Sequence, residues 1–167
     1  MKIYHGSTSV IETPEIIDSQ RFLDFGRGFY TTTNQVQAEK WAIIKQKRRG
    51  GNSKSIVSVY EIDDDLADSK KFETKKFPKA DSEWLNFVIS NRKGEIFHNY
   101  DIVIGAVAND KLYATLSLFE SGILSLKETI SRLKVHKLFD QISFHSQIVL
   151  KELVFVECYN LTSTKVG

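Results

Sequence analysis

Six short segments rich in β-branched and aromatic residues constrain the fold most, because each has the length and composition of a β-strand. Gly, Asn, Asp or Lys bounds them. They are KIYH (2–5), GFYTTT (28–33), SIVSVYEI (55–62), YDIVIGAV (100–107), DQISFHS (140–146) and LVFVECYNL (153–161). The chain is therefore predicted to contain at least six strands.

Helical segments with recognisable ends lie between these strands. Asn34, with Gln37 three residues on, starts a segment that Gly50 ends, and Ser125 with Glu128 forms a capping box. Apolar residues at helical spacing predict two further helices, in segments 82–94 and 112–122.

The predicted order is strand, strand, helix, strand, helix, strand, helix, helix, strand, strand. This order does not alternate as a doubly wound parallel sheet would, so the expected class is α+β. A length of 167 residues suits a single domain, 1–167, that buries roughly two thirds of its unfolded surface. Two charged segments, 45–54 and 70–79, are expected to be surface loops.

The charge balance and the cysteine content exclude few classes of binding partner. With 23 Lys plus Arg against 21 Asp plus Glu, the net charge of +2 favours neither a membrane surface nor a phosphate backbone as partner. The single Cys158 lies in an apolar run, which predicts a buried thiol in a reducing compartment. No window reaches the ~20 apolar residues of a membrane span. We expect a cytoplasmic protein with no membrane partner.

Motifs for phosphate loops and metals are missing from the sequence. It contains no GxGxxG, no GxxxxGK[ST], no CxxC and no HxxxH spacing among its four histidines, so no metal is expected. Cys158 in an apolar strand is more typical of packing than of thiol catalysis.

Three segments share a more specific pattern: YHGS (4–7), DFGRGFYTT (24–32) and FDQISFHS (139–146). In this order they resemble the ADP-ribosyltransferase superfamily, in the branch with a His, Tyr, Glu triad that includes the poly(ADP-ribose) polymerases. Most of the chain also resembles a small bacterial domain of unknown function grouped with that superfamily. The resemblance implies an ADP-ribosyltransferase-like split mixed sheet with flanking helices, and NAD as co-substrate.

The resemblance also implies roles for individual residues. Release of nicotinamide from NAD passes through a cation-like sugar, so the protein must hold the ring and stabilise the charge. Gly6 would bond the nicotinamide carboxamide through its backbone, and His5 would bond a hydroxyl of the adenosine ribose. Tyr30 and Trp41, eleven residues later, would sandwich the nicotinamide ring. Ser7 would support the carboxamide or His5.

The third triad position departs from the pattern, which usually has a glutamate there. Strand alternation puts Gln141 on one face with Ser143 and Asp140 on the other with Ile142. The match of DQISFHS favours Gln141, which keeps an oxygen for a ribose hydroxyl but lacks the charge, a loss of ~3 kcal/mol or more of transition-state stabilisation. Asp140 would take this position if the register were shifted by one.

Other polar residues are secondary. Arg27, on the glycine loop, is expected to meet the pyrophosphate of NAD bidentately. Asp24, Arg92, Asn109 and Asp110 are weaker candidates, since helix capping and an Asx turn explain Arg92 and Asn109 equally well.

These features predict an NAD-dependent mono-ADP-ribosyltransferase with His5, Tyr30 and Gln141 as catalytic residues, converging on one cleft with Trp41. The acceptor can be a protein, a nucleic acid or a small molecule, and a bacterial, toxin-like role is an association only. The alternative is a catalytically weak or inactive module that binds NAD or ADP-ribose, or a protein partner, on the same scaffold.

Overall fold

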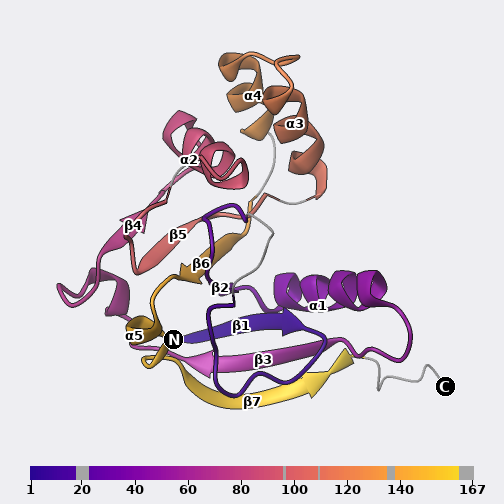
Figure 1. Ribbon diagram of the computed structural model, residues 1–167, viewed down its shortest axis with the longest axis vertical. Coiled ribbons are helices and arrows are strands. Elements are labelled where there is room, and N and C mark those ends of the chain that lie inside the picture. Colours follow the sequence, from indigo (N-terminus) through magenta and orange to yellow (C-terminus); the bar gives the residue numbers. More distant parts are fainter. Residues whose placement is uncertain (18–22, 96, 109, 135–137, 162–167) are drawn as a thin grey trace.

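Two β-sheets lie one above the other in the computed structural model, which describes residues 1–17, 23–95, 97–108, 110–134 and 138–161 (Figure 1). The first sheet has the order β1 (Lys2–Ser7), β3 (Ile56–Glu61), β7 (Val154–Asn160), with antiparallel pairing throughout. The second has the order β2 (Phe29–Thr31), β6 (Asp140–Phe144), β5 (Ile102–Ala106), β4 (Thr74–Lys76), and only β4 and β5 are parallel. The expected α+β class is confirmed.

Five α-helices belong to the described part of the chain. They are α1 (Gln35–Arg49), α2 (Ser82–Arg92), α3 (Asp110–Glu120), α4 (Leu126–Leu133) and α5 (Gln147–Leu150), with a short 3-10 turn at Leu66–Asp68. Figure 1 shows α2, α3 and α4 gathered beyond the second sheet, whereas α1 lies beside the first. No helix in the described ranges is long and apolar enough to cross a membrane.

The predicted order of elements is confirmed apart from three additions, the 3-10 turn at Leu66–Asp68, β4 and α5. The strand β4 lies in a charged segment that was expected to be a loop. Its side chains have no strand-like pattern, and its backbone pairing with β5 makes it a strand at the sheet edge. That pairing depends on residues distant in sequence.

Both predicted helix starts are confirmed. The Asn34 side chain accepts a hydrogen bond from the Gln37 N–H at 2.9 Å. Ser125 and Glu128 form a reciprocal capping box, with distances of 3.2 and 2.8 Å.

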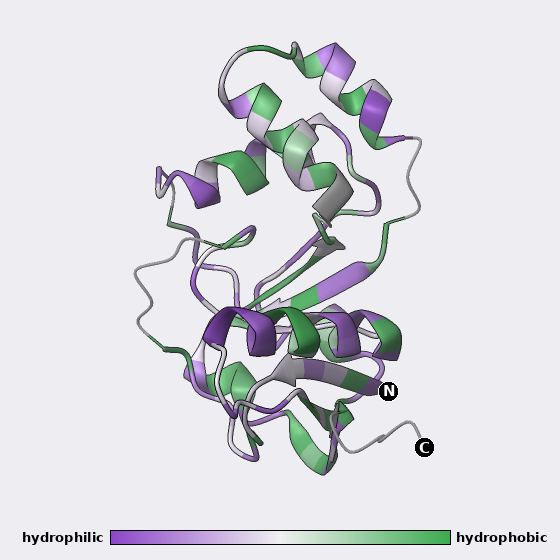
Figure 2. Ribbon diagram, turned by 90° about the vertical axis from the view of Figure 1, so that its right-hand side faces the viewer, coloured by the Kyte–Doolittle hydropathy of each residue, from purple (hydrophilic) through white to green (hydrophobic). Residues whose placement is uncertain are grey.

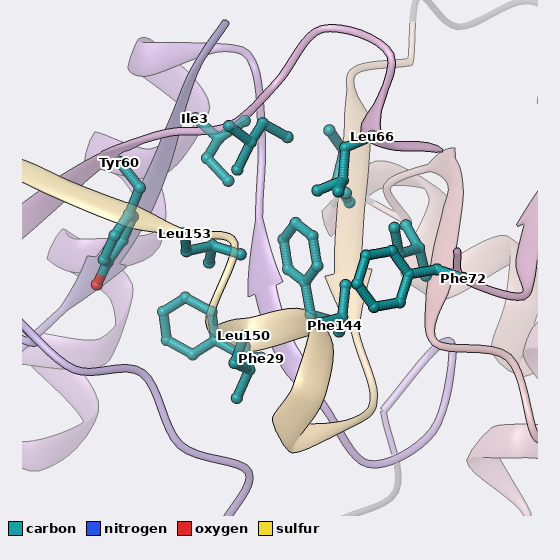
Figure 3. Packing of buried hydrophobic residues seen from close by; sticks show 12 residues of the cluster. Ile3, Phe29, Tyr60, Leu66, Phe72, Phe144, Leu150 and Leu153 are labelled. Carbon is teal, nitrogen blue, oxygen red and sulfur yellow. The ribbon is translucent and has the colours of Figure 1, made fainter. Parts of the chain in front are cut away.

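The main core lies between the two sheets. Figure 3 shows Ile3, Phe29, Phe144 and Leu153 converging there from β1, β2, β6 and the turn before β7. A second cluster fills the space under α2 and α3, where Trp84 is fully buried. Figure 2 shows hydrophobic and hydrophilic residues mixed on the helices at that end, as expected for helices buried on one side.

The expectation of a buried Cys158 is wrong, because the thiol is exposed. Its strand, β7, lies at the edge of the first sheet, and Val154 and Val156 of the same strand are 62% and 41% exposed. The apolar composition of this run therefore reflects strand formation rather than complete burial.

Helix α1 packs unusually closely on β1, and Gly6 makes this possible. A Cβ atom at Gly6 would lie 2.0 Å from the Ala38 carbonyl oxygen and 2.7 Å from the Ala42 nitrogen. Both obstacles are backbone atoms of α1, so no side-chain rotation relieves them.

Gly6→Ala should therefore lower the free energy of unfolding by about 2 to 4 kcal/mol, because α1 must move away from β1. Urea denaturation measures this loss. Gly51→Ala is the matched control: its Cβ would meet nothing within 4 Å, and its φ of +62° predicts a cost of only about 1 kcal/mol. Equal stability of the two variants would contradict the packing role of Gly6.

Candidate functional site

Three strands that carry the motif residues lie side by side where the two sheets meet. A two-way bridge joins Tyr4 of β1 to Thr32, just beyond β2, with N–O distances of 2.9 and 3.0 Å. Strand β2 in turn pairs with β6, so Tyr30 lies opposite Ser143. The fold thus brings together three segments that are far apart in sequence.

His5 is buried between the sheets, with 8% of its surface exposed. Its ring stacks on Phe29 at 4.3 Å between centroids, and its Nδ1 lies 2.6 Å from the Tyr30 carbonyl oxygen. Because a carbonyl only accepts, Nδ1 carries the proton and Nε2 is the acceptor nitrogen. Burial, reinforced by the Lys45 charge, lowers the pKa of His5 to about 3, so the ring is neutral at pH 7.

Gly6 and Ser7 both have partners within the chain. The Gly6 carbonyl accepts a hydrogen bond from Lys45 Nζ at 2.7 Å, and the Ser7 hydroxyl donates to the Ser9 carbonyl at 2.5 Å. In the role implied for Gly6, a carboxamide would therefore share this carbonyl oxygen with Lys45 or displace it. Ser7 supports its own loop rather than His5.

The hydroxyl of Tyr30 closes the glycine loop, residues 25–30. It donates to the Gly26 carbonyl at 2.5 Å and accepts from the Phe25 N–H at 2.9 Å. Gly26 has a φ of +86°, which favours glycine. The Tyr30 ring lies 6.4 Å from Phe25 and 6.2 Å, edge-on, from His145. Burial raises the pKa of Tyr30 well above its usual value, so the hydroxyl stays protonated.

Three of the four histidines hold backbone carbonyls of the glycine loop. The pairs are His98 Nε2 to Phe25, His145 Nδ1 to Arg27 and His5 Nδ1 to Tyr30, each at 2.6 Å. Ser143 lies 2.7 Å from the other ring nitrogen of His145, and burial lowers the pKa of His145 to about 4. The three rings come from different elements, so no sequence spacing reveals this arrangement.

Gln141 lies on the same face of the second sheet as Tyr30, because Tyr30 pairs with Ser143, two residues along β6. It is only 4% exposed. Its Nε2 lies 3.3 Å from Asp24 Oδ2 and 3.2 Å from the Ala106 carbonyl oxygen. Gln141, at the third position of the predicted triad, is thus hydrogen-bonded to the carboxylate of Asp24.

Asp140 lies on the other face of β6, with Ile142 and Phe144. Its carboxylate accepts a hydrogen bond from the Thr33 hydroxyl at 2.7 Å. The register therefore places Gln141, not Asp140, beside Tyr30.

His5 and Trp41 do not share the face of Tyr30. His5 stacks on Phe29, whose side chain points to the opposite face of β2. Trp41 is half-buried on α1, which packs mainly against β1. Within the described ranges, the rings next to Tyr30 belong to the glycine loop and His145. The structure brings Tyr30 and Gln141 together and leaves a Tyr30–Trp41 sandwich unformed.

A charged cluster, named here the Asp24 cluster, comprises Asp24, Gln141, Arg92 and Glu120. Burial raises the pKa of Asp24, and the charge of Arg92 opposes this rise. Arg92 Nε lies 3.8 Å from Glu120 Oε1, and its guanidinium carbon lies 4.3 Å from the centroid of the Tyr113 ring. The Arg92 side chain is 10% exposed, and its buried Nη1 has no hydrogen-bond partner among the described residues.

The remaining candidates contribute less. Arg27 is exposed at the glycine loop, and Asn109 lies outside the described residues. Glu120 and Tyr113 were missed because the helical spacing of α3 marks only its apolar residues. In the described part of the chain, no group of three His, Cys, Asp or Glu side chains could hold a metal ion.

A surface pocket of about 660 Å³ lies between the start of α2 and α4. Lys79, Lys127 and Lys134 line it together with Leu126 and Ile130. None of the predicted site residues lines this pocket, so it is separate from the junction of β1, β2 and β6.

Lowering the pH from 7 to 5 should destabilise the protein, because His5 and His145 take up protons mainly on unfolding. Their folded pKa values of about 3 and 4 lie below the unfolded value of about 6.5. Their contribution to the free energy of unfolding is therefore complete above pH 6.5 and is lost as the pH falls toward 4. His5 contributes about 2 kcal/mol of this change, and half-buried His145 less. Urea denaturation at both pH values measures it.

The variant His145→Gln is the control for this prediction. Its stability should depend less on pH than that of the wild type. Comparing the two proteins also cancels the contribution of Asp24, whose raised pKa acts in the opposite direction. An unchanged dependence on pH would assign His145 no part in the effect.

Searches of curated proteins and of solved structures found no match. Residues 1–155 match the family described as "Protein of unknown function (DUF3990)". This match covers most of the chain, including β1, β2, β6 and the Asp24 cluster. The chain therefore belongs to the DUF3990 family.

Proposed function

We propose that the chain is an NAD-dependent mono-ADP-ribosyltransferase that transfers one ADP-ribose unit to an acceptor and releases nicotinamide. The proposal rests on one observation: β1, β2 and β6 lie side by side where the two sheets meet. There, Nδ1 of His5 lies 2.6 Å from the carbonyl oxygen of Tyr30, and Gln141 shares the Tyr30 face. This arrangement supports the ADP-ribosyltransferase-like fold that the three sequence motifs imply.

The chemistry requires acceptors for ribose hydroxyls and an aromatic surface for nicotinamide. Neutral His5, whose ring lies against Phe29 on the face of β2 opposite to the Tyr30 ring, offers Nε2 as an acceptor, because its Nδ1 donates to the Tyr30 carbonyl. Gln141 offers its amide oxygen, and the Tyr30 ring offers a rigid aromatic surface held by its hydroxyl. Such fixed groups stabilise a developing sugar cation without reorganisation.

Gly6 can accept a second hydrogen bond beside Lys45, or replace the bond from Lys45 if that side chain moves. Its carbonyl is bonded to Lys45 Nζ at 2.7 Å. Lys45 is exposed as a residue, but burial around its ammonium lowers its pKa to about 8. Turning the ammonium toward solvent would relieve this desolvation and offset the lost hydrogen bond. Binding of a carboxamide at Gly6 would then replace one hydrogen bond by another.

The second candidate function is a binding module for NAD or ADP-ribose with little or no turnover. The neutral side chain of Gln141 favours it, since a carboxylate at this place would stabilise the sugar cation more strongly. The two functions differ in one measurable quantity, the release of nicotinamide.

Purified wild-type protein incubated with NAD should release nicotinamide above the rate without protein, and cell extract should increase the release by supplying an acceptor. Chromatographic separation of nicotinamide from NAD measures both rates. Binding of NAD in a calorimeter without any release would reject the transferase in favour of the binding module. Absence of both would reject both functions.

Replacing Tyr30 should separate its two roles. Tyr30→Phe removes the hydrogen bonds to the loop and should lower stability by about 1 to 2 kcal/mol, while NAD affinity stays the same because the ring remains. Tyr30→Leu should in addition weaken NAD binding about fivefold or more, since a stacking contact contributes about 1 kcal/mol. Calorimetry below the melting temperature of both variants decides this. Wild-type affinity in Tyr30→Leu would remove the ring from the site.

A further inference from the structure

We propose that Asp24 is a positioning residue for the third triad position: it fixes the carboxamide of Gln141 and supplies the negative charge that Gln141 lacks. The inference rests on the proposed function, because it concerns stabilisation of the sugar cation. It assigns to two side chains from distant segments the task that a single glutamate performs by itself.

The first step of the argument is the orientation of Gln141. Its Nε2 faces two acceptors, Asp24 Oδ2 at 3.3 Å and the Ala106 carbonyl at 3.2 Å. Because neither acceptor can donate when Asp24 is ionised, the nitrogen must be on this side and Oε1 on the other. Gln141 therefore presents an acceptor oxygen in one fixed orientation.

The second step is the rigidity of the anchor. The Ala106 carbonyl also accepts a hydrogen bond from Trp84 Nε1 at 3.2 Å, and Trp84 is fully buried. A backbone hydrogen bond at Ala108 holds Asp24 as well. Asp24 and Gln141 are thus bound to β5 and the residues that follow it, and a ligand would not need to order them.

The third step is the charge of the cluster. Arg92 lies near Asp24, but it also pairs with Glu120 at 3.8 Å and stacks over Tyr113. Burial raises the pKa of Asp24, whereas the Arg92 charge and the hydrogen bond from Gln141 lower it. With Asp24 ionised, two carboxylates and one guanidinium leave one net negative charge. The hydrogen bond from Gln141 to Asp24 polarises the amide and increases the negative charge on Oε1, in a half-buried place where charges act strongly.

The fourth step points to a ligand. Arg92 Nη1 is buried without a hydrogen-bond partner among the described residues, and such donors are rare in native proteins. An acceptor oxygen of a bound sugar or phosphate would satisfy it. The cluster thus contains one unpaired donor, Arg92 Nη1, and one polarised acceptor, Gln141 Oε1.

The reaction follows from these groups. The bond between the ribose C1′ and the pyridinium nitrogen breaks, and its electron pair leaves with nicotinamide. The sugar becomes a cation that the Gln141 oxygen and the Asp24 charge stabilise. An acceptor, or water in its absence, adds an oxygen to C1′ and gives up one proton to solvent. With water, the products are ADP-ribose, nicotinamide and one proton.

The first test is Asp24→Asn, which removes the charge but keeps an oxygen toward Gln141. It should lower kcat for nicotinamide release at least tenfold while KM for NAD changes less than about threefold. Asp140→Asn is the matched control, because Asp140 accepts from Thr33 on the other face of β6. It should leave kcat unchanged.

The second test moves the charge. Gln141→Glu in the wild-type background puts two carboxylates together, which share a proton, so kcat at pH 7 should stay near the wild-type value and gain a new pH dependence. The same substitution combined with Asp24→Asn restores one charge at the other position. The double variant should recover at least half of the wild-type kcat, a rescue that a purely structural role of Asp24 would not produce.

The outcomes are separable. A wild-type protein that releases no nicotinamide overturns the proposed function and this inference with it. Wild-type release that Asp24→Asn leaves intact overturns the inference alone. A double variant no more active than Asp24→Asn, with both variants folded by circular dichroism, also overturns it.

Discussion

The carbonyl groups of the glycine loop are the point on which the arrangement of the site depends. A strand of only three residues, β2, cannot hold its own position, because its two neighbours belong to different sheets. Histidines from β1, from the segment before β5 and from the residue just after β6 donate to this loop. Each ring fixes a backbone position while leaving its other nitrogen as an acceptor. The loop is thereby bound to both halves of the molecule.

Much of the fold could be predicted from the sequence because its determinants are local. The six strand segments, the caps at Asn34 and Ser125 and the order of elements depend on residues close together in the chain. Strand β4 and the exposure of Cys158 could not be predicted in this way. The first depends on pairing with β5, and the second on which side of an edge strand the rest of the chain covers.

The candidate site was only partly predictable for a related reason. Sequence motifs select the strands that meet, and alternation along β6 correctly separates Gln141 from Asp140. They do not show that α1 fills the space above Gly6, or that Asp24 bonds Gln141 across 117 positions of sequence. Those facts depend on packing between elements that are distant in sequence, and a sequence motif contains no information about such packing. Asp24 stands directly before the glycine loop, and its position there was the only signal of its role.

The exposed thiol of Cys158 gives the molecule a single chemical handle. It is the only cysteine in the chain, so a maleimide dye or spin label would attach at one place, on the edge strand of the first sheet. The glycine loop and β6 belong to the opposite side of the split between the sheets. A second label introduced there would report the separation of the two sheets directly. The architecture is thus suited to measuring, in solution, whether a ligand closes or opens the split.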